Sequence, residues 1–380
     1  MKLQRKTRQV GEVGQLLIVG FDGTKITPRL SSLLTRLQPA GVILFARNIE
    51  RAEQTWRLLR DCQKCVSNPL FTCVDLEGGN VDRFRDLLGP APSAADVFAT
   101  ADRKLFRRHG HVIGQNCRAL GFNVDFAPVL DLAFEASRRV MGSRSVSADP
   151  RDTVTYAREF LAGLRAAGVL GCGKHFPGLG EGTLDSHHEL PVIEKPLHKL
   201  WTEDLLPYRM LRNRLPMIMI SHAAYPLVTH DRAPASLSKH WLTNILRRRI
   251  GYRNLIASDD LEMGGVLSAA PVGKAAVEYV RAGGDLCLIC HREDHVAQAY
   301  DELVSTTERD SKFAKRAAAS IQRVLAFKKS AKMPWRTKPP SAAAVEKLSR
   351  KLWELGEEVR LEALACSERL SVRNTRRPRA

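Results

Sequence analysis

The chain reads Val169-Leu-Gly-Cys172 and then, after one glycine, Lys174-His-Phe-Pro-Gly-Leu-Gly-Glu-Gly-Thr-Leu-Asp-Ser-His-His-Glu-Leu-Pro191. The first four residues have the length and apolar character of a buried strand. The glycines of the second stretch let a loop turn sharply. Its titratable side chains include Lys174, His175, Asp185, His187 and His188. A strand that ends in such a loop is typical of a functional site, and chance clustering in a solvated turn explains it less well.

Similar short apolar runs recur along the whole chain. The eight runs are Leu16–Val19, Val42–Phe45, Phe71–Val74, Val124–Ala127, Val169–Cys172, Met217–Ile220, Leu255–Ala257 and Leu286–Ile289. Each is rich in Val, Ile or Leu, as in parallel strands that are buried on both faces. Helical periodicity separates them, for example over Thr153–Ala167 and over Lys274–Ala282, which Gly283-Gly284 ends.

This alternation predicts an α/β fold, specifically a (β/α)8 TIM-type barrel. A doubly wound open sheet is the alternative, but no G-x-G-x-x-G follows the first run. A barrel places functional side chains directly after its strands, at one rim. The polar and glycine residues in those positions are Asp75, Glu77, Gly78, Gly79, Asp131, Lys174, His175, Ser221, His222, Ser258, Asp259, Asp260 and His291. We therefore expect them to converge.

The pattern changes after Phe327, so we predict a barrel domain over 1–327 and an extension over 328–380. The extension begins with a basic, proline-containing linker over Lys328–Pro340 and ends in an Arg-rich tail that we expect to be disordered. Ser341–Glu368 should form a helix that packs on the barrel through an apolar stripe. The stripe consists of Leu348, Leu352, Leu355, Val359 and Leu364.

Composition narrows the class of protein. The 380 residues are 44% hydrophobic and 26% charged, as in a soluble globular protein. No membrane span or signal peptide is evident, so we expect a cytoplasmic protein. The net charge of +18 raises the question of nucleic acid, but no nucleic-acid module accompanies it. We expect no nucleic-acid partner, and the sequence leaves the oligomeric state open.

Two cysteine pairs, Cys62-x-x-Cys65 and Cys287-x-x-Cys290, have the spacing of metal knuckles. The first falls on a predicted helix. The second falls on a predicted strand, where positions three apart point to opposite faces. We therefore expect reduced, mostly buried thiols and no metal site at these pairs.

The rim residues suggest a two-step displacement. Asp259, at a strand end, is the best nucleophile candidate, although a carboxylate there could also hold a metal. An Asp185–His187 pair would supply a proton carrier, because a carboxylate fixes the tautomer of an imidazole and raises its basicity. A nucleophile and a proton carrier suit substitution at an acetal carbon. The remaining candidates, which would bind sugar hydroxyls, are Asp75, Arg83, Arg144, Lys174 and His175.

A metal-dependent barrel hydrolase is the competing interpretation. Its ligands would be His187, His188, His222, Asp259 and Asp260. Against it, the first predicted strand is followed by Gly20-Phe-Asp-Gly23, without a His-x-His pair. A non-catalytic basic scaffold would leave the rim residues unexplained.

The motifs Lys174-His-Phe-Pro-Gly178, Asp185-Ser-His187 and Ser258-Asp-Asp-Leu-Glu-Met263 resemble glycoside hydrolase family 3, in particular its single-domain bacterial β-N-acetylglucosaminidases of peptidoglycan recycling. Five further matches lie in the family order. They are Gly41-Val-Ile-Leu-Phe-Ala-Arg-Asn48, Asp75-Leu-Glu-Gly-Gly79, Phe126-Ala-Pro-Val-Leu-Asp131, Gly142-Ser-Arg-Ser145 and Met219-Ile-Ser-His222. The likeness runs from about Val13 to Phe327.

The resemblance implies a cofactor-free barrel enzyme that removes terminal N-acetylglucosamine from muropeptides with retention of configuration. It implies Asp259 as nucleophile, His187 as acid/base and Asp185 as its partner. The implied substrate-binding residues are Asp75, Arg83, Arg144, Lys174 and His175. Three positions depart from the family pattern: Leu76, Asn80 and Leu179 stand where Gln, Arg and His are common. These departures affect the expected hydrogen bonding of the loops on the leaving-group side.

Overall fold

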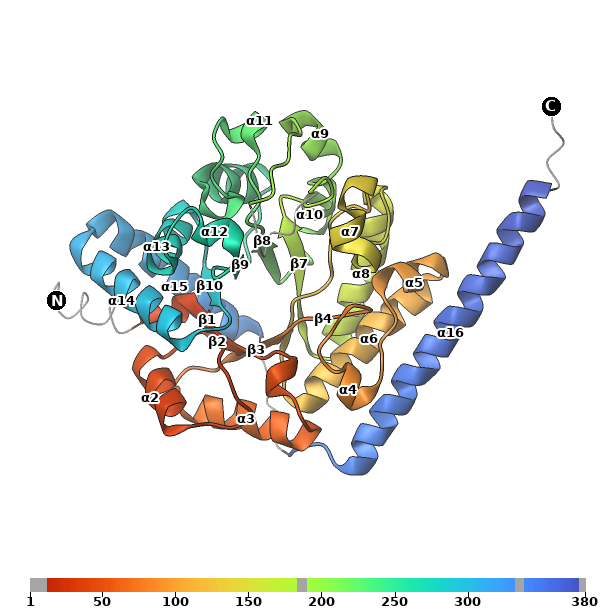
Figure 1. Ribbon diagram of the computed structural model, residues 1–380, viewed down its shortest axis with the longest axis horizontal. Coiled ribbons are helices and arrows are strands. Elements are labelled where there is room, and N and C mark those ends of the chain that lie inside the picture. Colours follow the sequence, from red (N-terminus) through yellow and green to blue (C-terminus); the bar gives the residue numbers. More distant parts are fainter. Residues whose placement is uncertain (1–11, 183–189, 332–337, 376–380) are drawn as a thin grey trace.

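The computed structural model describes residues 12–182, 190–331 and 338–375, with side chains as far as Cys366. At its centre is a closed barrel of eight parallel strands with helices around it (Figure 1). The strands are β1 (Leu17–Val19), β2 (Gly41–Ile43), β3 (Phe71–Val74), β6 (Val124–Asp125), β7 (Leu170–Phe176), β8 (Met217–Ile220), β9 (Leu255–Asp260) and β10 (Leu286–Ile289). The last strand pairs with the first, with Leu17 opposite Cys287. The predicted (β/α)8 barrel is confirmed.

Two strands are longer than the apolar runs that predicted them. β7 continues to Phe176 and β9 continues to Asp260, so polar residues of the predicted rim belong to the barrel wall itself. A small antiparallel hairpin, β4 (Leu76–Gly78) with β5 (Val81–Asp82), follows β3 and was not predicted from the sequence. Its turn contains Gly79 at a φ of 59°, in the left-handed region that glycine tolerates.

Helices cover the outside of the barrel. The longer ones are α2 (Pro28–Leu37), α3 (Ala52–Lys64), α6 (Arg103–Leu120), α8 (Pro150–Ala166), the π-helical segment η6 (His240–Arg249), α13 (Val272–Ala282), α14 (Glu293–Arg309) and α15 (Ser311–Ala331). The shorter ones are η1 (Val13–Leu16), η2 (Ala46–Asn48), α4 (Arg85–Leu88), α5 (Ala94–Ala99), η3 (Glu135–Ser137), α7 (Arg138–Met141), η4 (Gly142–Arg144), α9 (Leu197–Thr202), α10 (Leu206–Leu211), α11 (Pro226–Thr229), η5 (Ala235–Leu237) and α12 (Gly264–Leu267). None of the described helices is long and apolar enough to cross a membrane.

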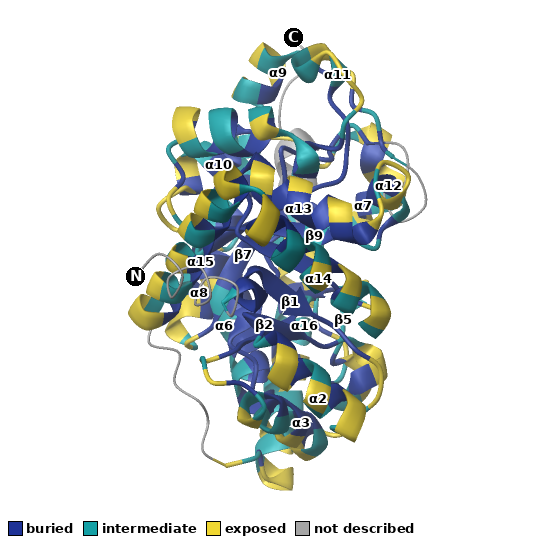
Figure 2. Cartoon of the chain, turned by 90° about the vertical axis from the view of Figure 1, so that its left-hand side faces the viewer, coloured by how far each residue is buried: buried dark blue, intermediate teal, exposed yellow. Residues whose placement is uncertain are grey.

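Local sequence explains where these helices begin and end. The side chain of Asp149 caps α8 by accepting from the N–H of Arg151, and Pro150 occupies the first turn. As an example of a helix end, α13 stops at Gly283, whose φ is 133°. Figure 2 shows the strands buried at the centre and the exposed residues on the outer faces of the helices. All eight cysteines are free of disulfide bonds, and six are buried, which confirms the expectation of mostly buried thiols.

The C-terminal helix α16 (Ala342–Thr375) runs along α4, α5 and α6, and its end projects beyond the body of the molecule (Figure 1). Leu352, Leu355 and Val359 are buried against this side of the barrel, as predicted. The prediction is wrong for Leu364, which is 54% exposed. The stripe continues in sequence, but Leu364 lines a groove between α16 and the segment from Leu88 to Ala99, where it is not covered.

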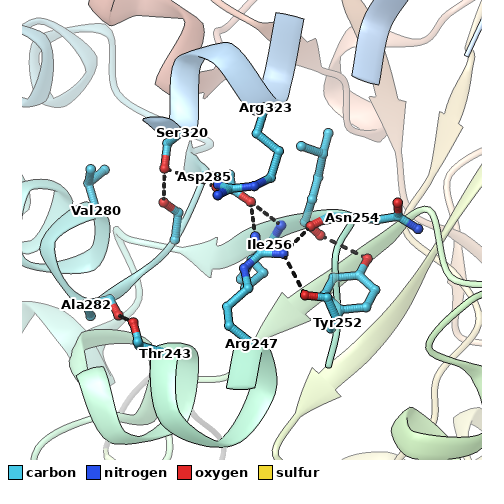
Figure 3. A network of polar contacts seen from close by, with 12 residues as sticks. Thr243, Arg247, Tyr252, Asn254, Ile256, Val280, Ala282, Asp285, Ser320 and Arg323 are labelled. Atoms are coloured by element: carbon cyan, nitrogen blue, oxygen red, sulfur yellow. Dashed lines mark hydrogen bonds and ion pairs between the residues drawn. The ribbon is translucent and has the colours of Figure 1, made fainter. Parts of the chain in front are cut away.

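One buried carboxylate, Asp285, joins the last strands to the helices outside them (Figure 3). It precedes β10 and accepts hydrogen bonds from Ser320 at 3.0 Å and from the backbone N–H of Ile256 at 2.9 Å. Arg247 of η6 and Arg323 of α15 each donate to it as well. Asp285 therefore connects β9, β10, η6 and α15 at the point where the barrel closes.

We expect Asp285→Ala to lower the free energy of unfolding by about 3–5 kcal/mol, because it leaves two largely buried arginines without their partner. Urea unfolding followed by circular dichroism measures the change. Asp301→Ala is the matched control, since Asp301 pairs with Arg36 at 3.4 Å and its side chain is 63% exposed. That variant should differ from the parent by less than about 1 kcal/mol. Equal losses in the two variants would contradict the role given to Asp285.

Candidate active site

A pocket of about 160 Å³ lies at the C-terminal ends of the barrel strands. Six of the residues predicted from the sequence line it together. They are Asp75, Arg83, Arg144, Lys174, His175 and Asp259. Apolar side chains such as Ile43, Met219 and Leu288 form part of the wall. The structure therefore brings these six predicted residues to one place. Asp185, His187 and His188 lie outside the described residues.

Lys174 lies at the end of β7 and is the centre of a charged network. Its Nζ is 2.6 Å from Asp75 Oδ1 and 2.7 Å from Glu77 Oε1. Glu77 in turn accepts from Nε and Nη2 of Arg144, both at 2.8 Å. The two carboxylates and two cations thus alternate, and paired contacts of this kind fix side chains in orientation as well as in charge.

Burial and ion pairing shift the pKa values of Glu77 and Lys174 in opposite directions. Burial raises the pKa of Glu77, but Arg144 and Lys174 outweigh it and hold that pKa well below its ordinary value. Burial lowers the pKa of Lys174, but Asp75 and Glu77 outweigh it and raise that pKa above its ordinary value. The net effect in both groups therefore favours the charged form. The sequence placed Glu77 at the rim but indicated no role for it, because no sequence pattern shows that two cations converge on it.

His175 follows Lys174 and is held by Asp131. Its Nδ1 is 2.6 Å from Asp131 Oδ2, and its backbone N–H donates to the same oxygen at 3.1 Å. The other carboxylate oxygen accepts from the backbone N–H of Leu179 at 2.7 Å. Leu179, where the family commonly has His, thus contributes its backbone to this arrangement. With Nδ1 engaged, Nε2 is the ring nitrogen that can face the pocket.

Asp259 lies near the end of β9. Burial raises its pKa, whereas the nearby His175 and His222 lower it. The backbone N–H of Asp260 donates to Asp259 Oδ1 at 2.8 Å and lowers the pKa further. The net pKa is below the ordinary value, so Asp259 is an ionised carboxylate that lines the pocket. Such a group can attack an electrophilic carbon.

His222 has a structural position behind this carboxylate. Its Nδ1 is 2.8 Å from Ser236 Oγ, and its Nε2 is 2.9 Å from the backbone oxygen of Asp260. Burial lowers the pKa of His222 and favours the neutral imidazole. Both ring nitrogens are therefore used, which does not fit the metal ligation that the competing interpretation gave to His222. In the described part of the chain, no three His, Cys, Asp or Glu residues are grouped to hold a metal ion.

The mouth of the pocket contains residues for which the sequence predicted no role. Phe45 stacks on His291 at a ring distance of 5.5 Å, and the guanidinium of Arg83 lies 5.5 Å from the Phe45 ring. His291 Nε2 is 3.2 Å from Asp260 Oδ2, and this contact raises the pKa of His291. An isolated aromatic residue after a strand carries no chemical signal of its own, so only its place in the Gly41–Asn48 motif could have indicated Phe45.

Comparisons with known proteins agree with this geometry. The model of the glycosyl hydrolase family 3 N-terminal domain matches residues 9–327. A β-hexosaminidase of Bordetella parapertussis is 37% identical over 311 residues, which cover 80% of this chain and 87% of that protein. A β-hexosaminidase of Haemophilus influenzae is 36% identical over 308 residues, covering 80% and 86%.

Solved structures of similar fold point to the same family. A family 3 β-N-acetylglucosaminidase from Paenibacillus sp. superposes with a TM-score of 0.83 at 30% identity, over 91% of this chain and 68% of that one. A β-N-acetylhexosaminidase from Beutenbergia cavernae superposes with a TM-score of 0.78 at 25% identity, over 84% and 98%. The chain therefore belongs to glycosyl hydrolase family 3 and is a glycoside hydrolase.

Proposed function

We propose that this protein is an exo-acting β-N-acetylglucosaminidase that releases terminal N-acetylglucosamine with retention of configuration. The observation that carries the proposal is that the carboxylate of Asp259 lines the same small pocket as the paired charged groups around Lys174. Relatives of similar length that are named β-hexosaminidases support the sugar specificity. The pocket volume of about 160 Å³ is suited to one sugar unit, which favours exo action.

The reaction that we propose has two steps. Asp259 attacks the anomeric carbon and forms a glycosyl ester while the glycosidic C–O bond breaks. His187, oriented by Asp185, protonates the departing oxygen. The same imidazole then accepts a proton from water, which attacks the anomeric carbon and releases Asp259. His187 and Asp185 lie outside the described residues, so their roles rest on the sequence motif.

The hydroxyl groups of the sugar would bind to the charged network around Lys174. In this proposal Asp75 accepts hydrogen bonds from ring hydroxyls, and His175 can accept or donate. Lys174, Arg144 and Arg83 donate to hydroxyl oxygens. Lys174 and Arg144 are already held by Asp75 and Glu77, so the sugar would meet groups whose positions are fixed before it binds. Fixed donors of this kind can stabilise charge that develops in the transition state.

We further propose that muropeptides from the cell wall are the natural substrates and that the enzyme acts in peptidoglycan recycling in the cytoplasm, without nucleic acid or membrane as partner. We also propose that the chain divides into a barrel domain over 1–327 and an extension over 328–380. The helix α15 itself continues past this division to Ala331.

An aryl β-N-acetylglucosaminide assayed with and without EDTA tests the proposed chemistry. We expect release of the aryl alcohol at the same rate under both conditions, because an aspartate nucleophile and an imidazole acid need no Lewis acid. An aryl β-glucoside, which lacks only the acetamido group, is the matched substrate and should react far more slowly. Activity that disappears with EDTA and returns with zinc would favour the metal-dependent hydrolase.

A further inference from the structure

A second polar pocket lies at the opposite end of the barrel from Asp259. It has a volume of about 590 Å³ and is lined by the start of β7, the residues before β8 and β9, and the faces of α8, α10 and α15. Its walls include the apolar side chains of Leu161, Met210 and Phe327. Its polar side chains are Arg158, Arg165, Asn213, Arg214, Asn254 and Ser330. Pockets of this size with apolar walls and a few polar groups are typical of small-molecule sites.

The charge of this pocket is unbalanced. Among the described residues, three arginines line it and no acidic residue does. Within the described residues, Arg158, Arg165 and Arg214 form no ion pair with a carboxylate. The Nε atom of Arg158 is also buried, and it has no hydrogen-bond partner among the described residues. Most buried donors in proteins find an acceptor, so an acceptor supplied by a ligand would complete the pocket.

Helix geometry explains part of this charge, but not all of it. The helices run antiparallel to the strands, so their C-terminal turns lie at this end of the barrel, where positive side chains are stabilised by the helix dipole. Arg36, Lys64 and Arg281 occupy such last turns, as does Arg165 in α8. Arg158 lies two turns earlier in α8, and Arg214 lies after α10. The helix dipole therefore does not account for these two arginines.

We propose that this pocket binds a phosphate group that is attached to an apolar body. The planar guanidinium group matches phosphate oxygens in pairs, and three such groups suit a dianion with several acceptor oxygens. The apolar walls provide contact area for the rest of the ligand. The site is separate from the proposed glycosidase pocket, and neither proposal depends on the other. The ligand could be a free phosphate ester or the headgroup of an anionic phospholipid, which share this chemistry.

Isothermal titration calorimetry with hexyl phosphate tests the proposal on the full-length protein. We expect hexyl phosphate to bind more tightly than inorganic phosphate, and hexanol not to bind. The triple variant Arg158→Gln/Arg165→Gln/Arg214→Gln should bind hexyl phosphate at least tenfold more weakly. The control variant Arg51→Gln/Arg151→Gln/Arg232→Gln removes the same charge from exposed positions outside the pocket and should bind like the parent.

Sedimentation with vesicles distinguishes the two sources of the phosphate. Binding to phosphatidylglycerol vesicles, but not to phosphatidylcholine vesicles, that is lost in the triple variant would identify a lipid headgroup. Binding of hexyl phosphate without vesicle binding would identify a free ester. Equal affinities of the parent and the triple variant for hexyl phosphate, or no binding to the parent, would overturn the proposal. Circular dichroism confirms folding, and Arg214→Gln alone, at an exposed position, replaces the triple variant if that variant does not fold.

Discussion

Replacing Asp259 with alanine is expected to remove hydrolysis of every β-N-acetylglucosaminide, whatever its leaving group. In the proposed mechanism both chemical steps pass through this carboxylate, so a better leaving group cannot compensate for its loss. The decrease in kcat should be on the order of 10⁴-fold or more, as for other enzymes that lose a nucleophile. Asp259→Asn should show a similar loss, because it preserves the shape of the side chain but not its nucleophilic charge.

Adding azide as an external nucleophile tests directly whether Asp259 is the attacking group. In Asp259→Ala the small anion can enter the space left by the carboxylate and attack the anomeric carbon of an aryl substrate, with departure of the aryl alcohol. The product should be a glycosyl azide of inverted configuration, which nuclear magnetic resonance identifies. A folded Asp259→Ala protein that keeps more than a few per cent of the parent activity without azide would remove Asp259 from the mechanism.

Replacing His187 with alanine should affect natural and activated substrates differently. In the proposed first step His187 protonates the departing oxygen, which a sugar leaving group needs and a nitrophenolate does not. Hydrolysis of a disaccharide should fall by about 10²–10⁴-fold, the range of general acid catalysis. With the aryl substrate, loss of the base in the second step should give a burst of aryl alcohol and then a slow steady rate.

Asp185→Ala is the graded control for His187, since it should weaken the imidazole without removing it and give a milder form of the same behaviour. Equal losses on both substrates in a folded His187→Ala protein, without a burst, would instead indicate that His187 only stabilises its loop. His175 would then be the next candidate for the proton carrier, because it lines the pocket and Asp131 holds its Nδ1 at 2.6 Å.

The fold was predictable because its signal is local. Each strand is a short apolar run, and the helices between them begin and end at residues such as Pro150 and Gly283. The exposure of Leu364 was not predictable, because the sequence does not show where a groove separates α16 from the segment beside it. The hairpin after β3 was missed for a related reason: its strands have only three and two residues.

For the candidate site, the sequence predicted which residues lie at the rim but not which partners hold them. Asp75, Lys174 and Asp259 each follow an apolar run, and this position alone predicts that they lie at one rim of a barrel. The partners of these residues depend on contacts between distant parts of the chain. Glu77 and Arg144, 67 positions apart, meet through two hydrogen bonds that no sequence pattern indicates. For His222, similarly, only the structure shows that both ring nitrogens are already used.

The network of Asp75, Glu77, Arg144 and Lys174 also has a stereochemical consequence. Because pairing keeps Glu77 and Lys174 charged, Lys174 and Arg144 can only donate hydrogen bonds and Glu77 can only accept them. No member can change its role to suit another ligand. In the proposed binding mode, an epimer of the sugar, with one hydroxyl turned to the other face of the ring, would leave one of these charged groups without its hydroxyl partner. We therefore expect discrimination between epimers to depend on ion pairs that do not touch the reacting carbon.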